Sequence, residues 1–407
     1  MRILLLTQWF QPEPLFKGLP FARELQRRGH SVEVLTGFPN YPGGRLYPGY
    51  RVRFYQRETI EGISVIRVPL YPSHDGSALK RVANYLSFAL SASLLGAALV
   101  RRADVMYVYH PPATVGLPAI VISMLRRIPF VVDIQDLWPD TLESTGMVRN
   151  AFILSLVGLW CRVVYALAAR ITVLSRGFQE ALVERSVPRD KVVVIYNWCD
   201  ESQVIAESPS QSLANSLGLA GKFVIVFAGN MGRAQQLDTV LDAAASLAAR
   251  EPNVRFVFVG SGIESERLKR RVSSEHIGNV LFVPRQSVTD VGRYLALGDA
   301  LLVNLSNDAL FRITIPSKTQ AYLACGKPLL MAVSGEAAEL VEGAGAGIAC
   351  EPGNPQALAE AVSTLRRMSR SERDAMGERA IAFYWSKLAL SIGTERFEQV
   401  FREVAQC

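Results

Sequence analysis

The chain has 407 residues, of which 49% are hydrophobic and 20% are charged. This length exceeds the usual size of a single-core domain about two- to threefold, so we expect two lobes and a cleft. The five cysteines are scattered and never form a CxxC pair, which excludes a small disulfide scaffold and fits a reducing cytoplasm. The short apolar run at the start lacks a small-residue cleavage site, so we interpret it as a strand rather than a signal peptide.

The positive charge is concentrated in the first half of the chain. Residues 1–200 contain 23 Lys and Arg against 15 Asp and Glu, a net charge of +8, whereas residues 201–407 have a net charge of −1. A basic lobe can attract a nucleic acid, an anionic substrate or the inner face of a membrane, because all three present phosphates. An ordinarily basic surface is the alternative.

Short apolar and β-branched runs alternate with helical stretches along the chain. The expected strands are residues 3–6, 32–36, 105–109, 130–134, 171–174, 192–196, 223–228, 254–259, 280–283, 300–305 and 328–332. This rhythm predicts parallel α/β sheets. A polar stretch at residues 201–218 interrupts the rhythm and marks the joint between two Rossmann-like lobes.

Two long apolar stretches lie in the first lobe. Residues 84–100 are uncharged, and residues 151–169 are interrupted by Arg162. Basic residues bracket the first stretch, at Lys80, Arg81, Arg101 and Arg102. The first stretch is at the lower limit for a span and the second is broken by a charge, so a transmembrane helix is not expected. We favour helices buried against the sheet, with a seat at an anionic bilayer surface as the alternative.

A glycine turn follows the first strand of the second lobe. It reads Gly229-Asn230-Met231-Gly232-Arg233 and precedes an amphipathic helix at residues 237–250. Such a turn presents free backbone N–H groups to an anion, and Arg233 adds a charged fork. The next strand ends in a second glycine turn, with Gly260 and Gly262, at the edge of the sheet where ligands bind. We predict a phosphate site here, with a tight turn beside a solvent-facing arginine as the alternative.

The most specific motif is IPSKTQAYLACGKPLL, at residues 315–330. Pro316 begins a helix, Ser317 and Lys318 lie in its first turn, and Gly326 ends it. A lysine in a first turn opposes the helix dipole, and a bound phosphate would turn that cost into a gain. We therefore predict that Lys318 and the helix-start amides bind a phosphate dianion, with a lysine that extends into solvent as the alternative.

In the first lobe, two polar residues follow strand ends at the edge where a cleft is expected. Asp136 comes after residues 130–134, where a carboxylate can orient or deprotonate an acceptor hydroxyl. A helix N-cap is an equal alternative for Asp136 or Asp140. His110 follows residues 105–109 and can reach the same cleft, although a structural role is more usual for a single histidine.

The loop after the first strand holds a further candidate group. Glu13, Lys17 and Gly18 are spaced so that they can contact a sugar or a diphosphate. Ordinary loop polarity is the alternative explanation.

Several signatures are absent from the sequence. It has no DxD pair, HExxH motif or Cys/His cluster, so we expect no required metal and no cofactor. The first strand is not followed by GxGxxG, which disfavours dinucleotide binding, and there is no GxSxG elbow. RRM, zinc and helix-turn-helix signatures are not apparent, so no nucleic-acid partner is expected.

Taken together, these segments resemble glycosyltransferase family 4, the retaining enzymes of GT-B fold, and within it the WbuB-type N-acetyl-L-fucosamine transferases. The resemblance covers nearly the whole chain and rests on ELQRRGHSVEVLTGFPNYPGG, PLYPSHDGSALKRVANYLSFA, PFVVDIQDLWPDTL, VPRDKVVVIYNWCD, FAGNMGRAQQLDTVLDAA and IPSKTQAYLACGKP. It implies an α/β fold with two facing Rossmann-like lobes, parallel sheets and a C-terminal helix that crosses back. The expected domains are an acceptor and membrane-facing lobe at 1–200, a nucleotide-sugar donor lobe at 201–385, and a returning helix at 386–407.

The chain departs from the family pattern at several positions. Ile313 and Ala321 stand where the family has its paired glutamates. Asn230 and Gln235 stand where it has the Arg and Lys of the donor lobe, and Gln135 stands where it has the histidine of the acceptor lobe. The usual ribose clamp, diphosphate pair and histidine role therefore do not carry over. We hypothesise that Arg233 and Lys318 replace the missing cations.

The resemblance implies transfer of a 2-acetamido-deoxyhexose from a UDP-sugar to a polyprenyl-diphosphate-linked sugar, in O-antigen, lipopolysaccharide or capsule synthesis. We expect Lys318 and Arg233 to stabilise the departing UDP, and Asp136 and His110 to position the acceptor. The expected donor contacts are Gly229, Asn230, Gly232, Gly260, Gly262, Arg285, Gln286, Pro316 and Ser317. The expected acceptor contacts are Glu13, Lys17, Gly18 and Gln135.

The enzyme is expected in the cytoplasm, associated peripherally with the anionic inner face of the cell membrane. The alternative activity is that of a nucleotide-sugar 2-epimerase, because the same two-lobed fold supports both reactions.

Overall fold

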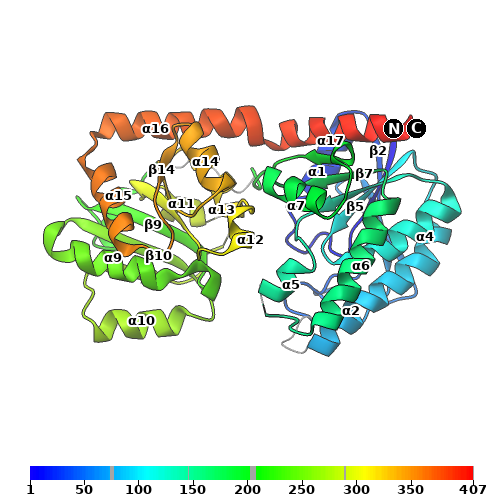
Figure 1. Cartoon of the computed structure of the whole chain (residues 1–407), viewed down its shortest axis with the longest axis horizontal. Helices are drawn as coiled ribbons and strands as arrows, with labels where there is room; N and C mark the ends of the chain where they lie inside the picture. Colours follow the sequence, from blue (N-terminus) through cyan, green and yellow to red (C-terminus); the bar gives the residue numbers. More distant parts are fainter. Residues whose placement is uncertain (74–77, 145, 202–207, 288–289, 407) are drawn as a thin grey trace. The chain divides into compact units, whose positions relative to one another are not determined.

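A computed structural model of the chain describes residues 1–73, 78–144, 146–201, 208–287 and 290–406. The chain divides into two compact units: unit 1 comprises Met1–Tyr196 and Gly393–Cys407, and unit 2 comprises Asn197–Ile392 (Figure 1). Each unit is an α/β domain built on a mainly parallel sheet, as predicted. The boundaries expected at residues 200 and 385 fall instead at 196 and 392.

Unit 1 contains an eight-stranded sheet in the order β3-β4-β2-β1-β5-β6-β7-β8. Its strands are β1 (Arg2–Leu6), β2 (Ser31–Gly37), β3 (Gln56–Ile60), β4 (Ile63–Val68), β5 (Val105–His110), β6 (Phe130–Ile134), β7 (Arg170–Val173) and β8 (Val192–Val194). All pair in parallel except β3 with β4. The β3–β4 hairpin was not predicted, because β3 lies at the sheet edge and alternates exposed polar residues with half-buried ones.

Helices flank this sheet. They are α1 (Leu19–Arg27), α2 (Ala78–Ser91) with its continuation η1 (Ala92–Gly96) and α3 (Ala97–Leu99), η2 (Ala113–Val115), α4 (Gly116–Arg126), α5 (Asp140–Ser144), α6 (Ala151–Leu167), α7 (Arg176–Glu184) and η3 (Arg189–Lys191). The last helix, α17 (Leu390–Ala405), belongs to unit 1 from Gly393 onward. Its Phe397 and Phe401 rings lie 5.5 and 6.2 Å from the ring of Tyr107 in β5, so the end of the chain completes the core of unit 1.

The long apolar run that begins in α2 covers the sheet with one side only. Phe88 is fully buried, and a Cβ on Gly96 would lie 2.5 Å from Cδ2 of Leu35 in β2. Residues Leu79–Leu99 are long and apolar enough to cross a membrane, and 39% of their most apolar 18-residue window is buried. The expectation of a buried helix is therefore correct for one side of α2 and its continuation η1 and wrong for the other side, where Leu94 of η1 is 75% exposed.

Unit 2 contains a six-stranded parallel sheet in the order β11-β10-β9-β12-β13-β14. Its strands are β9 (Phe223–Asn230), β10 (Val254–Ser261), β11 (Val280–Val283), β12 (Ala300–Asn304), β13 (Leu329–Ala332) and β14 (Gly347–Ala349). Only β14, which is three residues long, was not predicted. The helices are α8 (Gln211–Ser216), η4 (Arg233–Gln235), α9 (Leu237–Arg250), α10 (Ser265–Ser274), α11 (Val291–Leu295), α12 (Ala309–Arg312), α13 (Ser317–Cys325), α14 (Glu336–Gly343), α15 (Pro355–Arg367), α16 (Arg370–Phe383) and η5 (Tyr384–Leu388).

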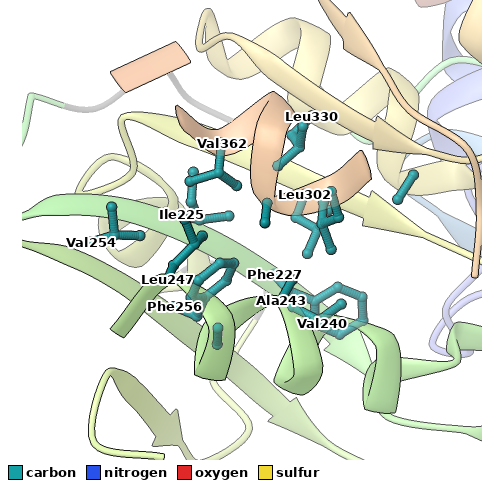
Figure 2. Close-up of a cluster of buried hydrophobic side chains, with 14 of the residues drawn as sticks. Ile225, Phe227, Val240, Ala243, Leu247, Val254, Phe256, Leu302, Leu330 and Val362 are labelled. Atoms are coloured by element: carbon teal, nitrogen blue, oxygen red, sulfur yellow. The ribbon is translucent and has the colours of Figure 1, made fainter. Parts of the chain in front are cut away.

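The core of unit 2 lies between its sheet and the helices α9 and α15. Figure 2 shows the interlocking side chains, among them Ile225, Phe227, Val240, Leu247, Phe256, Leu302, Leu330 and Val362. These positions follow the two-residue repeat of the strands and the helical repeat of α9, which explains why both elements were predictable. The packed core holds β9, and therefore the turn that follows it, in one position.

Each sheet contains one point at which the strand order reverses. In unit 1, β1 lies between β2 and β5, and in unit 2, β9 lies between β10 and β12. At such a point the connections leave toward opposite faces of the sheet and open a crevice at the carboxyl ends of the strands, where ligands bind. A site is therefore expected at the carboxyl ends of β1 and β5, and of β9 and β12.

Candidate functional site

The carboxyl ends of β9 and β10 form a glycine cradle in unit 2. Gly229 and Gly260 are paired in register, with φ values of +132° and +142° that side-chain-bearing residues rarely adopt. A Cβ on Gly260 would lie 2.1 Å from the carbonyl oxygen of Gly229. A cavity of about 310 Å³ lies at this cradle, and among the residues that line it are Gly229, Asn230, Gly260, Gly262, Arg285 and Gln286. The structure thus brings these six predicted donor contacts together.

Lys318 lies against the cradle. It stands in the first turn of α13, which begins at Ser317 after Pro316, as predicted. Its Nζ lies 3.5 Å from the ring centroid of Phe227, and a Cβ on Gly229 would lie 2.7 Å from its Cε. Burial lowers the pKa of Lys318 from 10.5 to about 7, and no described carboxylate offsets this shift. A buried amine in this situation becomes charged most readily when an anionic ligand lies beside it.

Tyr322 positions α13, a role that the sequence analysis missed. Its buried hydroxyl accepts a hydrogen bond from the N–H of Ala228 at 2.8 Å and donates to the carbonyl of the same residue at 3.1 Å. Because Ala228 precedes Gly229, these bonds tie the helix to the cradle. The available signal was spacing: Tyr322 follows Lys318 by four residues and lies on the same side of the helix.

Five of the residues predicted to contact or stabilise the donor do not line the cavity, namely Gly232, Arg233, Pro316, Ser317 and Lys318. Arg233 opens the turn η4, and its side chain is 87% exposed, with Nε 3.6 Å from Glu264 Oε1. Gly232 is buried, and its N–H donates to the side-chain oxygen of Gln235 at 3.0 Å. Arg233 therefore has a solvent-exposed charge in the turn after β9, whereas Gly232 shapes the turn.

A buried polar network lies beneath the carboxyl edge of the sheet in unit 1. Asp133 Oδ2 accepts hydrogen bonds from Lys17 Nζ at 2.8 Å, Tyr107 Oη at 2.7 Å and Gln135 Nε2 at 2.8 Å. Its Oδ1 accepts from the hydroxyl of Thr172 at 2.7 Å. Lys17 and Gln135 were expected to contact the acceptor, but here they satisfy a buried carboxylate, which would otherwise be costly to desolvate.

Glu13 has a similar internal role in the loop after β1. Its carboxylate accepts hydrogen bonds from the N–H groups of Phe10, Asn40 and Tyr41 at 3.0, 2.7 and 2.7 Å. Burial raises its pKa to about 7, although the three N–H donors oppose the shift. Gly18 precedes α1, and a Cβ there would lie 2.7 Å from a glutamine oxygen. Glu13 and Gly18 thus shape the loop rather than present a group to a ligand.

Asp136 and His110 lie at the carboxyl edge of β5 and β6. Burial raises the pKa of Asp136 to about 6, and burial lowers the pKa of His110 to about 4, so the imidazole is neutral at pH 7. His110 Nδ1 has no hydrogen-bond partner among the described residues. The N-cap alternative is not observed for Asp140, which lies within α5 and pairs with Arg185 at 2.6 Å. The Asp136 carboxylate can therefore accept a hydrogen bond from a substrate hydroxyl near neutral pH.

Three aromatic rings beside Asp136 were also missed. The ring centroid of Trp9 lies 4.8 Å from that of Tyr41 and 6.5 Å from that of Tyr85. The Asp136 charge contributes to raising the pKa of both tyrosines, which shows that they lie near the carboxylate. All three rings are partly exposed, and aromatic side chains combine an apolar surface with a polar group. In the sequence, Trp9 and Tyr41 only follow predicted strands and Tyr85 lies in the apolar stretch at residues 84–100, so no motif singled out the three rings.

The sequence matches two family models, which together span most of the chain. Residues 19–198 match the glycosyl transferase 4-like domain, and residues 211–383 match the glycosyl transferases group 1. The chain belongs to glycosyltransferase family 4. The first model lies within unit 1 and the start of unit 2, and the second lies within unit 2, which holds the glycine cradle.

Curated relatives are similar to this glycosyltransferase over most of its length. The putative colanic acid biosynthesis glycosyl transferase WcaI of Escherichia coli is 28% identical over 310 residues, covering 74% of this chain and 75% of the relative. The probable glycosyltransferase WbjE of Pseudomonas aeruginosa is 24% identical over 291 residues, covering 70% and 72%.

Solved structures share the fold along nearly the whole chain. Anabaena HepE in complex with UDP and glucose has a TM-score of 0.71 at 18% identity, with 99% of this chain and 100% of that chain covered. The trehalose-phosphate synthase of Burkholderia vietnamiensis has a TM-score of 0.72 at 14% identity, with coverage of 100% and 98%. These likenesses establish a GT-B fold with two α/β domains.

Proposed function

We propose that this glycosyltransferase transfers a 2-acetamido-deoxyhexose from a UDP-sugar to a polyprenyl-diphosphate-linked sugar, with retention at the anomeric carbon. The observation that carries the proposal is Lys318, a buried amine beside a glycine-lined cavity of about 310 Å³. The name of the relative WcaI, a putative colanic acid biosynthesis glycosyl transferase, supports a role in bacterial surface polysaccharide synthesis, and the UDP bound to HepE supports a UDP-sugar donor. N-acetyl-L-fucosamine, the sugar of the WbuB-type enzymes, is the first donor sugar to test.

In the proposed reaction, unit 2 holds the donor. Cleavage of the bond between the sugar and the phosphate leaves negative charge on UDP. Lys318 and the free N–H groups at the start of α13 are placed to stabilise that charge, and a fixed donor of this kind commonly contributes about 3 kcal/mol. Arg233 supplies a second cation from its exposed turn. Arg285 and Gln286, on the cavity wall, are candidates for contact with the base or the diphosphate.

Unit 1 holds the acceptor in this proposal. Asp136 accepts a hydrogen bond from the acceptor hydroxyl, neutral His110 orients the same group, and the rings of Trp9 and Tyr41 pack against the sugar. The hydroxyl attacks from the face that UDP leaves, so the new C–O bond replaces the bond to phosphate with retention. The hydroxyl proton passes to the departing phosphate oxygen, which means that Asp136 positions the acceptor and is not required as a base.

The expectation of a metal-independent reaction is also part of the proposal. Among the described residues, no group of three or more His, Cys, Asp or Glu side chains could hold a metal ion. The two proposed cations, Lys318 and Arg233, would stabilise the diphosphate in place of a divalent ion. Activity that a chelator abolishes and manganese restores would contradict this part.

A nucleotide-sugar 2-epimerase was the alternative. Both matched family models describe glycosyl transferases, so the comparisons do not favour it. An epimerase would convert its UDP-sugar without an acceptor, which NMR of an acceptor-free reaction would reveal.

The deciding experiment screens UDP-2-acetamido sugars against a short-chain polyprenyl-diphosphate N-acetylhexosamine, with the product read by mass spectrometry. The wild type should transfer one of these sugars, and Lys318→Met should lose most turnover. Lys269→Met is the matched control, because it removes a half-exposed lysine that pairs with Glu266 on α10. No transfer from any UDP-sugar, together with clear binding of another nucleotide, would overturn the proposed donor class.

A further inference from the structure

Large exposed apolar side chains recur along two helices of unit 1. On α2 and its continuation, the exposed positions are Leu79, Val82, Leu86, Leu90 and Leu94. On α6 they are Phe152, Ile153, Leu156, Leu159, Val163 and Leu167, and α4 ends with exposed Met124 and Leu125. On α2 with its continuation and on α6, a spacing of mostly three or four residues places the exposed positions on one side of the helix. We call the exposed side chains of α2, α4 and α6 the apolar face.

The three helices lie side by side (Figure 1), and α4 contacts both of the others. A Cβ on Gly116 of α4 would lie 2.4 Å from Val164 of α6, so these two helices pack closely. The indole N–H of Trp160 in α6 donates to the carbonyl of Ala113 at 2.9 Å, just before α4. The outward sides of the three helices therefore adjoin.

The described part of unit 2 has no comparable exposure of apolar side chains. In the described part of unit 2, the exposed large apolar side chains are Ile263 and Trp385 alone. The outer helix α10 of that unit has the sequence SERLKRRVSS and is mostly charged. A large exposed apolar surface on one unit indicates a site of interaction with a protein or a membrane.

The charge of the apolar face identifies the partner. Residues 78–99, 113–126 and 151–167 contain no Asp or Glu, and their charged residues are Lys80, Arg81, Arg126 and Arg162. A solvated helix surface normally mixes both signs, whereas apolar residues flanked only by basic ones match the acyl chains and phosphates of an anionic bilayer.

A basic cavity adjoins the end of α4. It has a volume of about 980 Å³ and is lined by residues that include Arg102, Arg126, Arg127 and Arg402, with Leu125 on its wall. Its acid, Asp104, already pairs with Arg2 at 2.8 Å. The cavity thus offers arginines to a phosphate directly beside an exposed leucine of the apolar face.

The inner side of α2 prevents this helix from crossing the bilayer. Buried Asn84 accepts a hydrogen bond from Gln8 at 2.6 Å and donates to Asn40 at 3.1 Å and to the carbonyl of Tyr71 at 2.7 Å. A spanning orientation would break this network and strip Phe88 from the sheet. The apolar helix is packed against the sheet on one side, so its apolar residues on the opposite side require another apolar environment.

We propose that unit 1 is seated on an anionic bilayer through the apolar face, with α2 and α6 lying in the plane of the membrane interface. Arg126, Arg127 and the neighbouring basic cavity contact lipid phosphates. This inference deepens the proposed function, on which it rests, because it names the surface through which the enzyme reaches a lipid-linked acceptor.

The test is co-sedimentation with vesicles of phosphatidylcholine, with and without phosphatidylglycerol. Wild type should bind the anionic vesicles, and Leu86→Asp/Leu90→Asp should reduce the partition coefficient by about tenfold or more for each leucine, because a buried leucine contributes that much. Leu156→Asp/Leu159→Asp should do the same from α6.

Two further double variants complete the vesicle experiment. Ser212→Asp/Ser371→Asp is the matched control, because it adds two carboxylates at exposed first-turn positions of unit 2. This control should bind like wild type. Arg126→Gln/Arg127→Gln should remove much of the salt-sensitive part of binding and leave the apolar part.

The same variants are also used to test whether the fold and the donor site remain intact. Their melting temperatures and UDP affinities should equal those of wild type, and transfer to a water-soluble acceptor should persist. Failure of wild type to bind anionic vesicles, or binding as strong as that of wild type by both leucine variants, overturns the inference. A dimer that Leu86→Asp/Leu90→Asp dissociates, without vesicle binding, would assign the face to a second copy. Vesicle binding that depends on the face, in an enzyme that transfers no UDP-sugar, would refute only the proposed reaction.

Discussion

Raising the pH from 7 to 9 should weaken the binding of UDP through one side chain, Lys318. In the free protein, burial against Phe227 lowers its pKa to about 7, so the amine loses its charge across this range. A bound diphosphate favours the charged form and raises the pKa again. Binding should therefore be accompanied by proton uptake at Lys318.

The size of the effect follows from this pKa. If only the charged amine binds, the dissociation constant scales with one plus the ratio of uncharged to charged lysine. That sum rises from about 2 at pH 7 to about 100 at pH 9, so the affinity for UDP should fall about 50-fold. The second pKa of a phosphate monoester is about 6, so the titration of UDP itself does not produce this slope.

Isothermal titration calorimetry at pH 7, 8 and 9, in buffers of different ionisation enthalpy, measures both the affinity and the protons taken up. Uptake should be about half a proton at pH 7 and close to one at pH 9. Lys318→Met should bind weakly with no slope, and Lys269→Met should follow wild type. A flat wild-type profile, or the same slope in Lys318→Met, would refute the assignment.

The same pKa shift predicts an effect on stability. The folded-state pKa of Lys318 lies below its unfolded value, so the unfolded chain binds more protons between pH 7 and 10.5 and wild-type stability rises with pH there. Lys318→Met should therefore raise the melting temperature most below pH 7, with the gain disappearing as the pH approaches 10.5. A gain that grows with pH would contradict this explanation.

Three further predictions concern single side chains. Tyr322→Phe leaves the buried N–H of Ala228 without an acceptor and should lower the unfolding free energy by about 1–3 kcal/mol in urea, with weaker UDP binding; an unchanged midpoint argues against its positioning role. Asp133→Asn leaves buried Lys17 without its carboxylate and should cost about 3–5 kcal/mol in the same assay, whereas a loss near zero would show that the pair is dispensable. Asp136→Asn should reduce transfer to the acceptor by about tenfold or more at unchanged UDP affinity, measured by steady-state kinetics, and unaltered transfer would exclude it from the acceptor site.

The backbone geometry around the glycine cradle and α13 was largely predictable because its signals are local. A buried strand followed by Gly229, and Pro316 and Gly326 at the two ends of α13, are short-range patterns with defined backbone consequences. Gly326 indeed has a φ of +68° at the helix end. Tyr322 was not predictable in this way, because its partner Ala228 lies 94 residues away in the sequence.

The candidate acceptor residues of unit 1 show the opposite case. Lys17 and Glu13 lie in a polar loop, and loop polarity suggested exposed groups. The partner of Lys17 is Asp133, 116 residues later, and Glu13 binds N–H groups 27 and 28 residues away. The local sequence pattern shows that a side chain is polar, but only the folded structure shows whether that side chain is free to bind a ligand or is hydrogen-bonded to another residue.

The apolar stretches failed to predict burial for a related reason. A run such as that of α2 identifies a helix with apolar side chains on every side. How many of those sides are covered by protein depends on the neighbouring elements. The sheet covers one side of α2, and Leu86 and Leu90 on the other side remain exposed.

The division of unit 1 into two stretches of sequence has a consequence for synthesis of the protein. Unit 2 is continuous, so all its strands are present once residue 392 has been made. The core of unit 1 cannot be completed until Phe397 and Phe401 have been translated, after the whole of unit 2, because these two side chains pack against Tyr107. On the ribosome, the order of folding should therefore be the reverse of the order of the sequence, with the first lobe to be made the last to be completed.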